Sequence, residues 1–313
     1  MPVNRALRPR RQRAIGKRPE ECSEFPQWRG RRQKQMQVQW SLSGFGDEID
    51  PDPSVQAAVL AAHGAKHVEV RSAWGVNVVD MDDEVLSRVQ AALKQRSAAV
   101  SAVASPIGKS QVSGPVEYEV ERLRRLVRVA DAFETRYVRI FSYYREDGQT
   151  AEEVREPVLE RMGALAEVAK AEGLILLHEN EKGVYGDTPA RVADLMAAID
   201  SPALRVAWDS ANFVQVGVRP FTEGYALLRP YLEYLQVKDA ILATGQVVPA
   251  GEGDGELRET LEAMREDGFV GFASLEPHLA ASPSEPNREG PEAFGRAARA
   301  FAALTAEVGV ALV

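Results

Sequence analysis

Short apolar runs alternate with longer amphipathic stretches along the chain from Gln39 onward. Runs rich in β-branched and aromatic residues predict buried strands, and apolar residues at helical spacing predict amphipathic helices. The pattern contains eight strand–helix units. The predicted strands cover residues 39–43, 68–70, 98–103, 137–141, 174–178, 205–208, 232–237 and 271–275. The predicted helices cover residues 53–63, 82–95, 117–133, 152–172, 188–199, 222–228, 256–266 and 291–308.

Eight units in one unbroken series favour a closed (β/α)8 TIM barrel over an open, doubly wound α/β sheet. A barrel of about 250 residues fits within this chain. We therefore expect residues 36–313 to form a single catalytic domain, with a mobile Pro-, Ser- and Glu-rich loop at Ala280–Gly290. In such a barrel the active site lies where the carboxyl ends of the strands lead into the following loops.

The first 35 residues differ from the rest in charge. They contain eleven Lys or Arg side chains against three Glu, so they carry a surplus of eight positive charges. Because the formal net charge of the chain is −8, residues 36–313 carry −16. Such an acidic body argues against nucleic acid as a partner, since phosphate contacts need a basic surface. We predict a disordered, functionally neutral extension at 1–35, with a nucleic-acid tail or a targeting segment as alternatives.

The composition, 45% hydrophobic and 27% charged, is that of an ordinary soluble globular protein. Cys22 is the single cysteine, which excludes an internal disulfide or a multi-cysteine zinc site and fits a reducing cytosol. No stretch reaches the roughly 18 consecutive apolar residues of a membrane-spanning helix. We therefore expect a cytoplasmic protein without a membrane partner.

Three carboxylates follow apolar runs at predicted strand ends: Glu179, Asp209 and Glu276. One carboxylate after a strand is usually a helix cap or a solvated loop residue. Three at corresponding places, each close to a His or Asn, instead indicate a shared site. Strands five, six and eight lie close together around a barrel rim, and Gln236 on strand seven is placed to complete the arc. Oxygen donors of this kind suit a hard divalent cation such as Mg²⁺ or Mn²⁺.

The two glutamates also suggest a reaction. Removing a proton next to a carbonyl needs a base within hydrogen-bond reach and a positive charge that stabilises the enediolate. We predict that Glu179 and Glu276 act as base and conjugate acid on opposite sides of a chelated sugar. The expected activity is therefore that of an isomerase or epimerase.

Several motifs of the chain together resemble the xylose isomerase-like sugar isomerase/epimerase superfamily. The resemblance covers about Val38 to Leu304, and its motifs are specific in combination. They are His178-Glu179-Asn180-Glu181-Lys182-Gly183, Tyr185-Gly186-Asp187-Thr188-Pro189, Trp208-Asp209 with Asn212, Lys238-Asp239, the glycine-rich run 249–255 and Ser274-Leu275-Glu276-Pro277-His278. The resemblance implies an α/β barrel that binds one divalent cation, most often Mn²⁺, with Mg²⁺ or Co²⁺ as alternatives.

Carried over by position, the metal ligands of this superfamily fall on Glu179, Asp209, Gln236 and Glu276. Gln236 stands where the usual ligand is histidine, and an amide oxygen donates more weakly, which lowers the affinity or shifts the preference towards Mg²⁺ or Mn²⁺. Asn212 stands where many members have a histidine that contacts the substrate.

Further polar residues near the strand ends are candidates for binding a sugar or sugar phosphate. His278 lies two residues past Glu276, on the same side of its strand, and a loop histidine that only hydrogen-bonds its neighbours is the alternative. Trp74 can form an apolar wall against a sugar face, and packing beneath a loop is its alternative. Each of the basic residues can hold a hydroxyl or phosphate group or simply be a solvated surface charge: Lys238, Lys182, Lys109 and Arg71.

Other functions use the same architecture. A dehydratase, or a lyase that cleaves oxidised glycosides, begins with the same deprotonation, and some such lyases need a partner subunit. An apurinic-site endonuclease of this fold uses several zinc ions and many histidines, whereas this chain has four. A non-catalytic sugar-binding barrel is the remaining alternative. A homo-oligomer is compatible with each of these functions.

Overall fold

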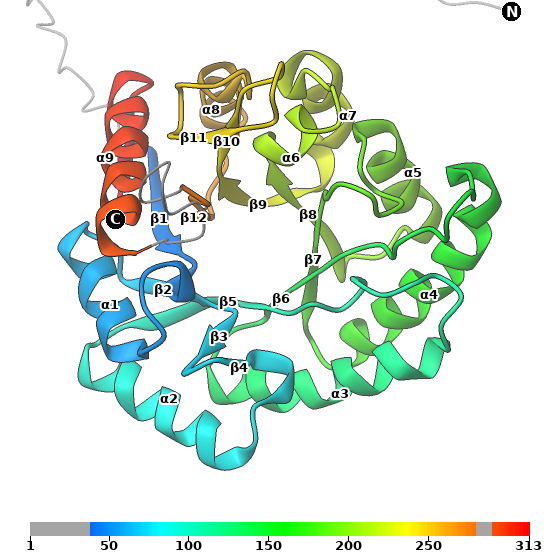
Figure 1. The fold of residues 1–313 in the computed structure, drawn as a ribbon, viewed down its shortest axis with the longest axis horizontal. Coiled ribbons are helices and arrows are strands. Elements are labelled where there is room, and N and C mark those ends of the chain that lie inside the picture. The colour runs from blue at the N-terminus through cyan, green and yellow to red at the C-terminus, as the bar shows by residue number, and fades with distance from the viewer. Residues whose placement is uncertain (1–37, 280–289) are drawn as a thin grey trace, which may run out of the picture. The chain divides into compact units, whose positions relative to one another are not determined.

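A ring of strands surrounded by helices makes up the described part of the chain (Figure 1). The computed structural model describes residues 38–279 and 290–313. The predicted extension at 1–35 and positions 280–289 of the predicted loop lie outside the described residues.

Eight parallel strands form the barrel, as the apolar runs predict. Their order in the sheet is β1, β12, β9, β8, β7, β6, β5 and β2, and a parallel bridge between Phe45 and Glu69 joins the two ends. The strands are β1 (Val38–Gly44), β2 (His67–Val70), β5 (Ala99–Ala104), β6 (Tyr137–Ile140), β7 (Ile175–Glu179), β8 (Leu204–Asp209), β9 (Leu232–Val237) and β12 (Phe272–Leu275).

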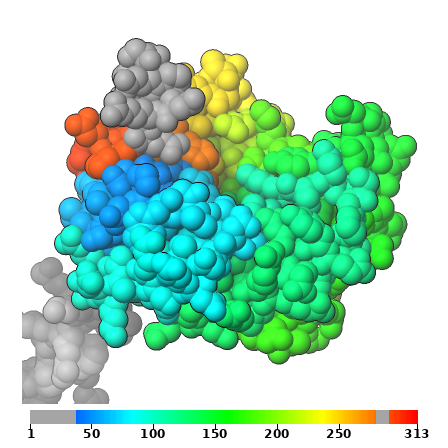
Figure 2. All heavy atoms as spheres, turned by 60° about the horizontal axis from the view of Figure 1, so that its bottom comes forward, coloured from blue at the N-terminus to red at the C-terminus, as the bar shows by residue number. Residues whose placement is uncertain are grey.

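Helices lie outside this ring, and Figure 2 shows the cyan and blue-green segments that contain α2 and α3 on the face turned towards the viewer. The longer helices are α1 (Pro53–Ala62), α2 (Asp83–Gln95), α3 (Val116–Ala132), α4 (Ala151–Ala171), α5 (Pro189–Ile199), α8 (Leu257–Glu266) and α9 (Pro291–Glu307). The short 3-10 turns are η1 (Gly46–Glu48), η2 (Val78–Asp80) and η4 (Arg229–Tyr231). In the described ranges no helix has both the length and the apolar character that a membrane crossing requires.

The connection between β8 and β9 is more broken than the single helix predicted at 222–228. It consists of α6 (Ser210–Val214), the π-helix η3 (Pro220–Tyr225), α7 (Ala226–Leu228) and the 3-10 turn η4. A Cβ atom on Gly224 would lie 2.8 Å from Cγ of Pro189, so η3 packs directly against the start of α5. The irregular turn therefore follows from tertiary packing, and hydrophobic periodicity in the sequence does not reveal such packing.

Three short pairings were not predicted. β13 (Val310–Leu312) follows α9 and pairs in parallel with β1, which adds a ninth strand at the edge of the sheet. Two antiparallel hairpins stand at the ends of barrel strands: β3 (Ser72–Ala73) with β4 (Val76–Asn77), and β10 (Asp239–Ala240) with β11 (Val247–Val248). Segments of two or three residues are too short to show a hydrophobic period.

The barrel interior is layered. Leu177, Ala207 and Tyr234 form a small buried apolar cluster with Ala102, separate from the main core between sheet and helices. Because side chains alternate along a strand, residues two positions later on the same strands also point inward. This next layer is polar and contains Glu179, Asp209 and Gln236. The fold thus places the candidate site at the carboxyl ends of the strands, above an apolar floor.

Candidate active site

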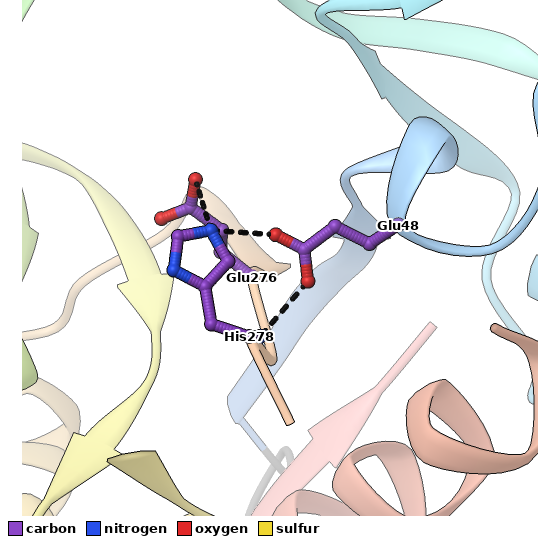
Figure 3. A group of neighbouring side chains, drawn as sticks. All are labelled: Glu48, Glu276 and His278. Atoms are coloured by element: carbon purple, nitrogen blue, oxygen red, sulfur yellow. Dashed lines mark hydrogen bonds and ion pairs between the residues drawn. The ribbon is translucent and has the colours of Figure 1, made fainter. Parts of the chain in front are cut away.

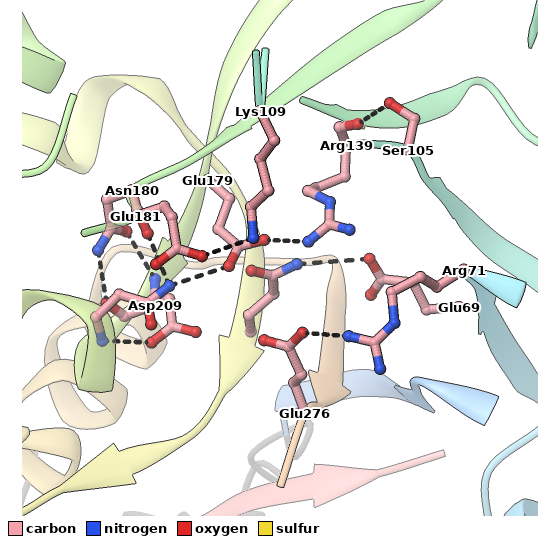
Figure 4. Close-up of polar contacts among 12 residues, drawn as sticks. Glu69, Arg71, Ser105, Lys109, Arg139, Glu179, Asn180, Glu181, Asp209 and Glu276 are labelled. Atoms are coloured by element: carbon pink, nitrogen blue, oxygen red, sulfur yellow. Dashed lines mark hydrogen bonds and ion pairs between the residues drawn. The ribbon is translucent and has the colours of Figure 1, made fainter. Parts of the chain in front are cut away.

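The three strand-end carboxylates converge. Glu179 is the last residue of β7, Asp209 is the last residue of β8, and Glu276 directly follows β12. One carboxylate oxygen from each lies within 4.8 Å of the others, and all three side chains are buried. Figure 4 shows them projecting towards one another from their strands. The register explains the convergence, since Asp209 pairs with Gln236 on β9, which links β8 to β12.

Two asparagines hold the carboxylates in place. The side chain of Asn180 donates from Nδ2 to the carbonyl oxygen of Asp209 (2.9 Å) and accepts from its backbone N–H (3.0 Å). Asn212 donates from Nδ2 to Oε1 of Glu179 (3.0 Å) and to the carbonyl oxygen of Asn180 (2.9 Å). Its backbone N–H donates to Oδ1 of Asp209 (2.9 Å), which caps α6. Asn212 thus braces the candidate base.

The buried side chains of Lys238 and Arg139 and the partly buried side chain of Arg71 lie against the same carboxylates. Nζ of Lys238 is 3.0 Å from Oδ2 of Asp209 and 2.7 Å from Oε2 of Glu276. Nη1 of Arg139 donates to Oε2 of Glu179 at 2.6 Å, and Nη1 of Arg71 lies 3.0 Å from Oε1 of Glu276. Such pairs offset the cost of removing charges from water only while both partners remain.

These surroundings shift the pKa values of Asp209 and Glu276, the two carboxyls that share Lys238, in opposite directions. Burial raises the pKa of Asp209 to about 7, although Lys238 opposes the shift. Burial also acts to raise the pKa of Glu276, but Lys238, His278 and Arg71 outweigh it and hold that pKa well below its usual range. Of the two carboxyls, Glu276 is therefore the one kept ionised.

A fourth carboxyl group, that of Glu69, lies next to Gln236. Glu69, on β2, is fully buried and accepts a hydrogen bond from the Tyr234 hydroxyl (2.9 Å). Nε2 of Gln236 lies 3.5 Å from Oε1 of Glu69, while Oε1 of Gln236 is buried and accepts no hydrogen bond among the described residues. Burial raises the pKa of Glu69 to about 7, against the opposing effect of Arg139.

This raised pKa predicts a pH-dependent stability for the cation-free protein. The folded pKa of Glu69 exceeds its ordinary value of 4.5, so its stabilising contribution is complete below pH 4.5 and is lost as the pH rises through about 7. Between pH 6 and pH 8 we expect this group to lower the free energy of unfolding by about 1 kcal/mol. Urea unfolding of wild type and Glu69→Gln at both pH values, with a chelator present, measures this component as the difference between the two pH dependences. Equal pH dependences would contradict the assignment.

His278 is held against the other side of Glu276 (Figure 3). Its Nε2 lies 2.9 Å from Oε1 of Glu48 and 3.4 Å from Oε1 of Glu276. Its backbone N–H donates to Oε2 of Glu48 at 2.9 Å, and its φ is 44°, a left-handed conformation that is unusual for a residue with a Cβ. Burial acts to lower the pKa of His278, but the adjacent Glu276 carboxylate outweighs it and raises the pKa to about 10.

A cavity of about 210 Å³ opens beside these residues, and of the three converging carboxylates Glu276 lines it. Five of the residues predicted to bind substrate line it: Arg71, Lys109, Asn212, Lys238 and His278. Lys109 and Glu181 form an ion pair of 2.8 Å at its rim.

Trp74 and Lys182, the other two predicted substrate contacts, are not among the residues that line this cavity. Trp74 lies in the β3–β4 turn, where its ring contacts the Arg88 guanidinium at 4.5 Å. Lys182 is exposed, and its backbone N–H donates to Glu181. Trp74 thus packs against a neighbouring side chain, and Lys182 is a solvated surface charge.

Arg139 is the main functional candidate that the sequence patterns did not single out. It lies in the middle of β6 and is 4% exposed. Tyr137, Arg139 and Phe141 alternate with Val138 and Ile140, so a charged residue in the inward-facing set was the available signal. A buried guanidinium requires a carboxylate partner, which here is Glu179.

The glycine-rich run after β11 is organised by one carboxylate. Asp239 accepts hydrogen bonds from the backbone N–H groups of Gly251, Gly253 and Gly255, at 2.9 to 3.1 Å. A Cβ atom on Gly253 would lie 2.4 Å from Oδ1 of Asp239, so the loop can wrap this carboxylate only with glycine at that position. The run therefore forms a turn that wraps around the Asp239 carboxylate.

The residues present fit a divalent cation. Glu179, Asp209 and Glu276 supply anionic oxygen atoms, and Oε1 of Gln236 is a buried acceptor without a hydrogen bond from the described residues. The surrounding carboxylates outnumber the cations even when His278 is protonated. The carboxylates are Asp47, Glu48, Glu69, Glu179, Glu181, Asp209 and Glu276, and the cations are Arg71, Lys109, Arg139 and Lys238. An oxygen-rich site with excess negative charge suits a hard cation.

A closed barrel of eight parallel strands, with buried carboxylates gathered at their carboxyl ends, defines a class of α/β-barrel proteins with an acidic centre. Within that class the chain belongs to the xylose isomerase-like TIM barrel family, whose model matches residues 57–302.

Two relatives of known activity differ in the reaction they catalyse. The chain is 21% identical over 232 residues to the 3-dehydroshikimate dehydratase of Bacillus anthracis. This match covers 68% of this chain and 81% of the relative. It is 33% identical over 98 residues to the 2-epi-5-epi-valiolone 7-phosphate 2-epimerase of an Actinoplanes strain, a match that covers 31% of this chain and 34% of the relative. The relatives are thus enzymes, a dehydratase and an epimerase.

Solved structures support the fold. The IOLI protein with a bound zinc atom aligns with a TM-score of 0.70 at 14% identity, covering 86% of this chain and 99% of that one. A Mycobacterium smegmatis xylose isomerase-like TIM barrel protein in complex with magnesium has a TM-score of 0.61 at 18% identity, covering 85% and 97%. D-allulose 3-epimerase from Methylomonas, in complex with D-allulose, has a TM-score of 0.67 at 13% identity, covering 85% and 96%.

Proposed function

We propose that the protein is a divalent-cation-dependent isomerase or epimerase that removes a proton next to the carbonyl group of a sugar or sugar-like ketone. The convergence of Glu179, Asp209 and Glu276 next to a cavity that Glu276 lines carries this proposal. Relatives that include an epimerase, and a structural neighbour that binds D-allulose, support a small polyhydroxylated substrate.

The two glutamates are the proposed acid–base pair. Glu179 takes the proton from one face of the substrate, and Glu276 returns a proton at the other. Arg139 and Asn212 each donate to one oxygen of Glu179, so its carboxylate is fixed in direction. Lys238 and Arg71 keep Glu276 ionised in the cation-free protein, so Glu276 has to take up a proton from water before it can return one to the enediolate.

Four side chains are the proposed ligands of the cation: Glu179, Asp209, Gln236 and Glu276. A bound divalent cation would supply positive charge beside the substrate oxygens, where negative charge develops as the proton leaves. All four ligand atoms are oxygen, which favours Mn²⁺ or Mg²⁺, with Co²⁺ next. Lys238 and His278 then remain to donate hydrogen bonds to substrate hydroxyl or phosphate groups at the cavity wall.

A dehydratase or lyase is the second candidate, because the relative that covers most of this chain is a dehydratase. Elimination begins with the same proton abstraction by Glu179, but a leaving group departs before Glu276 can return a proton. Such an enzyme can act alone or with a partner subunit. Product mass separates the two candidates, since an isomerase conserves the mass of its substrate whereas an elimination does not.

Removal of the cation tests the proposal. The protein is stripped with a chelator, reloaded with Mn²⁺, and incubated in D₂O with a panel of ketoses, keto-sugar phosphates and cyclic keto-polyols. We expect deuterium at the carbon next to the carbonyl, detected by NMR, at a rate at least about 100-fold higher with Mn²⁺ than with chelator, since charge stabilisation of this kind contributes several kcal/mol. A Mn²⁺-loaded protein that exchanges no substrate hydrogen across the panel would refute the proposal.

A further inference from the structure

A glutamine that ligates a cation meets a difficulty that a carboxylate does not. Its amide has an oxygen on one branch and an NH₂ group of nearly the same shape on the other. Only the oxygen donates electrons to a cation. In the reversed orientation the amide presents two N–H groups to the cation and contributes repulsion. A Gln236 ligand therefore needs a neighbour that distinguishes its two ends.

The structure contains such a neighbour. Nε2 of Gln236 faces Oε1 of Glu69 at 3.5 Å, across the barrel from β9 to β2. Both side chains are fully buried. Oε1 of Gln236 accepts no hydrogen bond from the described residues, so the end that faces away from Glu69 is the one left for a ligand.

Glu69 is itself held in position. Its Oε2 accepts from the Tyr234 hydroxyl at 2.9 Å, and that hydroxyl is 2.9 Å from Oγ of Ser101. Oγ of Ser101 is in turn 2.6 Å from Oγ of Ser43. This buried chain joins side chains from β2, β9, β5 and β1 inside the barrel. It fixes the Glu69 carboxyl so that its second oxygen is directed at the amide of Gln236.

We propose that Glu69 is a positioning residue that selects the orientation of the Gln236 amide. When Glu69 is ionised, a reversed amide would place its oxygen against a Glu69 oxygen, two acceptors in contact inside a buried site, which is strongly unfavourable. Glu69 thereby presents Oε1 of Gln236 to the cation. This role rests on the proposed function only in taking Gln236 as a ligand.

Two substitutions of similar size separate this role from the charge of Glu69. Both Glu69→Gln and Glu69→Leu remove the negative charge, and with it the same long-range attraction for a cation. Glu69→Gln keeps an acceptor oxygen for Gln236, because its own NH₂ group can donate to the Tyr234 hydroxyl. Glu69→Leu offers no acceptor, so the Gln236 amide is free to reverse.

The measurement is Mn²⁺ affinity by titration calorimetry, with urea unfolding in chelator to confirm that each variant is folded. We expect Glu69→Leu to bind Mn²⁺ at least about tenfold more weakly than Glu69→Gln, as is typical when the partner that orients a ligand is lost. The difference should shrink in a Gln236→His background, because either ring nitrogen of histidine can ligate. Equal affinities of the two Glu69 variants would overturn the proposal.

Gln236→Leu separates this inference from the proposed function. We expect it to weaken Mn²⁺ binding at least as much as Glu69→Leu does. If Gln236→Leu binds Mn²⁺ like wild type, then Gln236 is not a ligand and the positioning role of Glu69 is overturned. The wild-type D₂O exchange experiment then decides the isomerase proposal on its own terms.

Discussion

Glu179→Gln is expected to lower the rate of substrate hydrogen exchange by at least about 1,000-fold, because an amide cannot accept the proton that a carboxylate base removes. The substitution keeps the size of the side chain and leaves an oxygen to accept from Arg139 or Asn212, so the fold should be preserved. Exchange is followed by NMR in D₂O on the Mn²⁺-loaded protein, with circular dichroism as the check on folding.

A comparison with Glu276→Gln makes this test specific to a pair of bases. If the substrates are epimers, each variant should block proton removal from one epimer, so the two variants should fail on opposite substrates. Glu233→Gln is the matched control. Glu233 lies on β9 towards the opposite end of the barrel, where it accepts from the Tyr137 hydroxyl, and its loss should leave exchange within about twofold of wild type. Exchange by Glu179→Gln within tenfold of wild type would refute its role as the base.

The barrel could be predicted because parallel strands buried on both faces appear as short apolar runs. The eight predicted strands match the observed ones to within one or two residues at each end. Elements defined by packing could not be predicted in this way. The π-helix at Pro220–Tyr225 depends on the contact between Gly224 and Pro189 in α5, and β13 is too short to have a pattern of its own.

The convergence of the carboxylates followed from topology alone. Residues at the carboxyl ends of neighbouring barrel strands must meet at one rim, so Glu179, Asp209 and Glu276 could be grouped from their places after apolar runs. The side chains that pair with these carboxylates could not be predicted. The alternation of side chains shows that Arg139 faces inward, but only the three-dimensional structure shows which carboxylate it meets.

The contact between Glu69 and Gln236 likewise could not be predicted from the sequence. Glu69 and Gln236 are separated by 167 positions in sequence and contact each other across the barrel. Sequence spacing assigns each to the inner face of its strand. It does not determine which inward residues of opposite strands come into contact, because this depends on the stagger of the strands around the closed barrel.

Lys238→Met is expected to lower the free energy of unfolding of the cation-free protein by about 3–5 kcal/mol, the usual cost of removing one partner from a buried ion pair. The Lys238 ammonium lies between Asp209 and Glu276 and is almost completely buried. Methionine fills a similar volume without charge, so the variant retains packing and leaves the two carboxylates facing each other. Urea unfolding at pH 8 in chelator measures the loss, since Asp209 of the wild type, whose pKa of about 7 includes the lowering by Lys238, is then mostly ionised.

The same variant should respond more strongly than wild type to a divalent cation. With Lys238 gone, the cation no longer competes with an ammonium for the carboxylates, so its affinity rises and binding to the folded state restores stability by mass action. Lys109→Met is the matched control: its ammonium forms an ion pair with Glu181, lies 4.2 Å from the centroid of the Phe141 ring and is about one-third exposed, so its loss should cost no more than about 1 kcal/mol. A Lys238→Met protein as stable as wild type in chelator, or equally responsive to Mn²⁺, would show that Lys238 and the cation do not share these carboxylates. The expected result instead makes the buried lysine the group that keeps an acidic barrel folded until a cation binds.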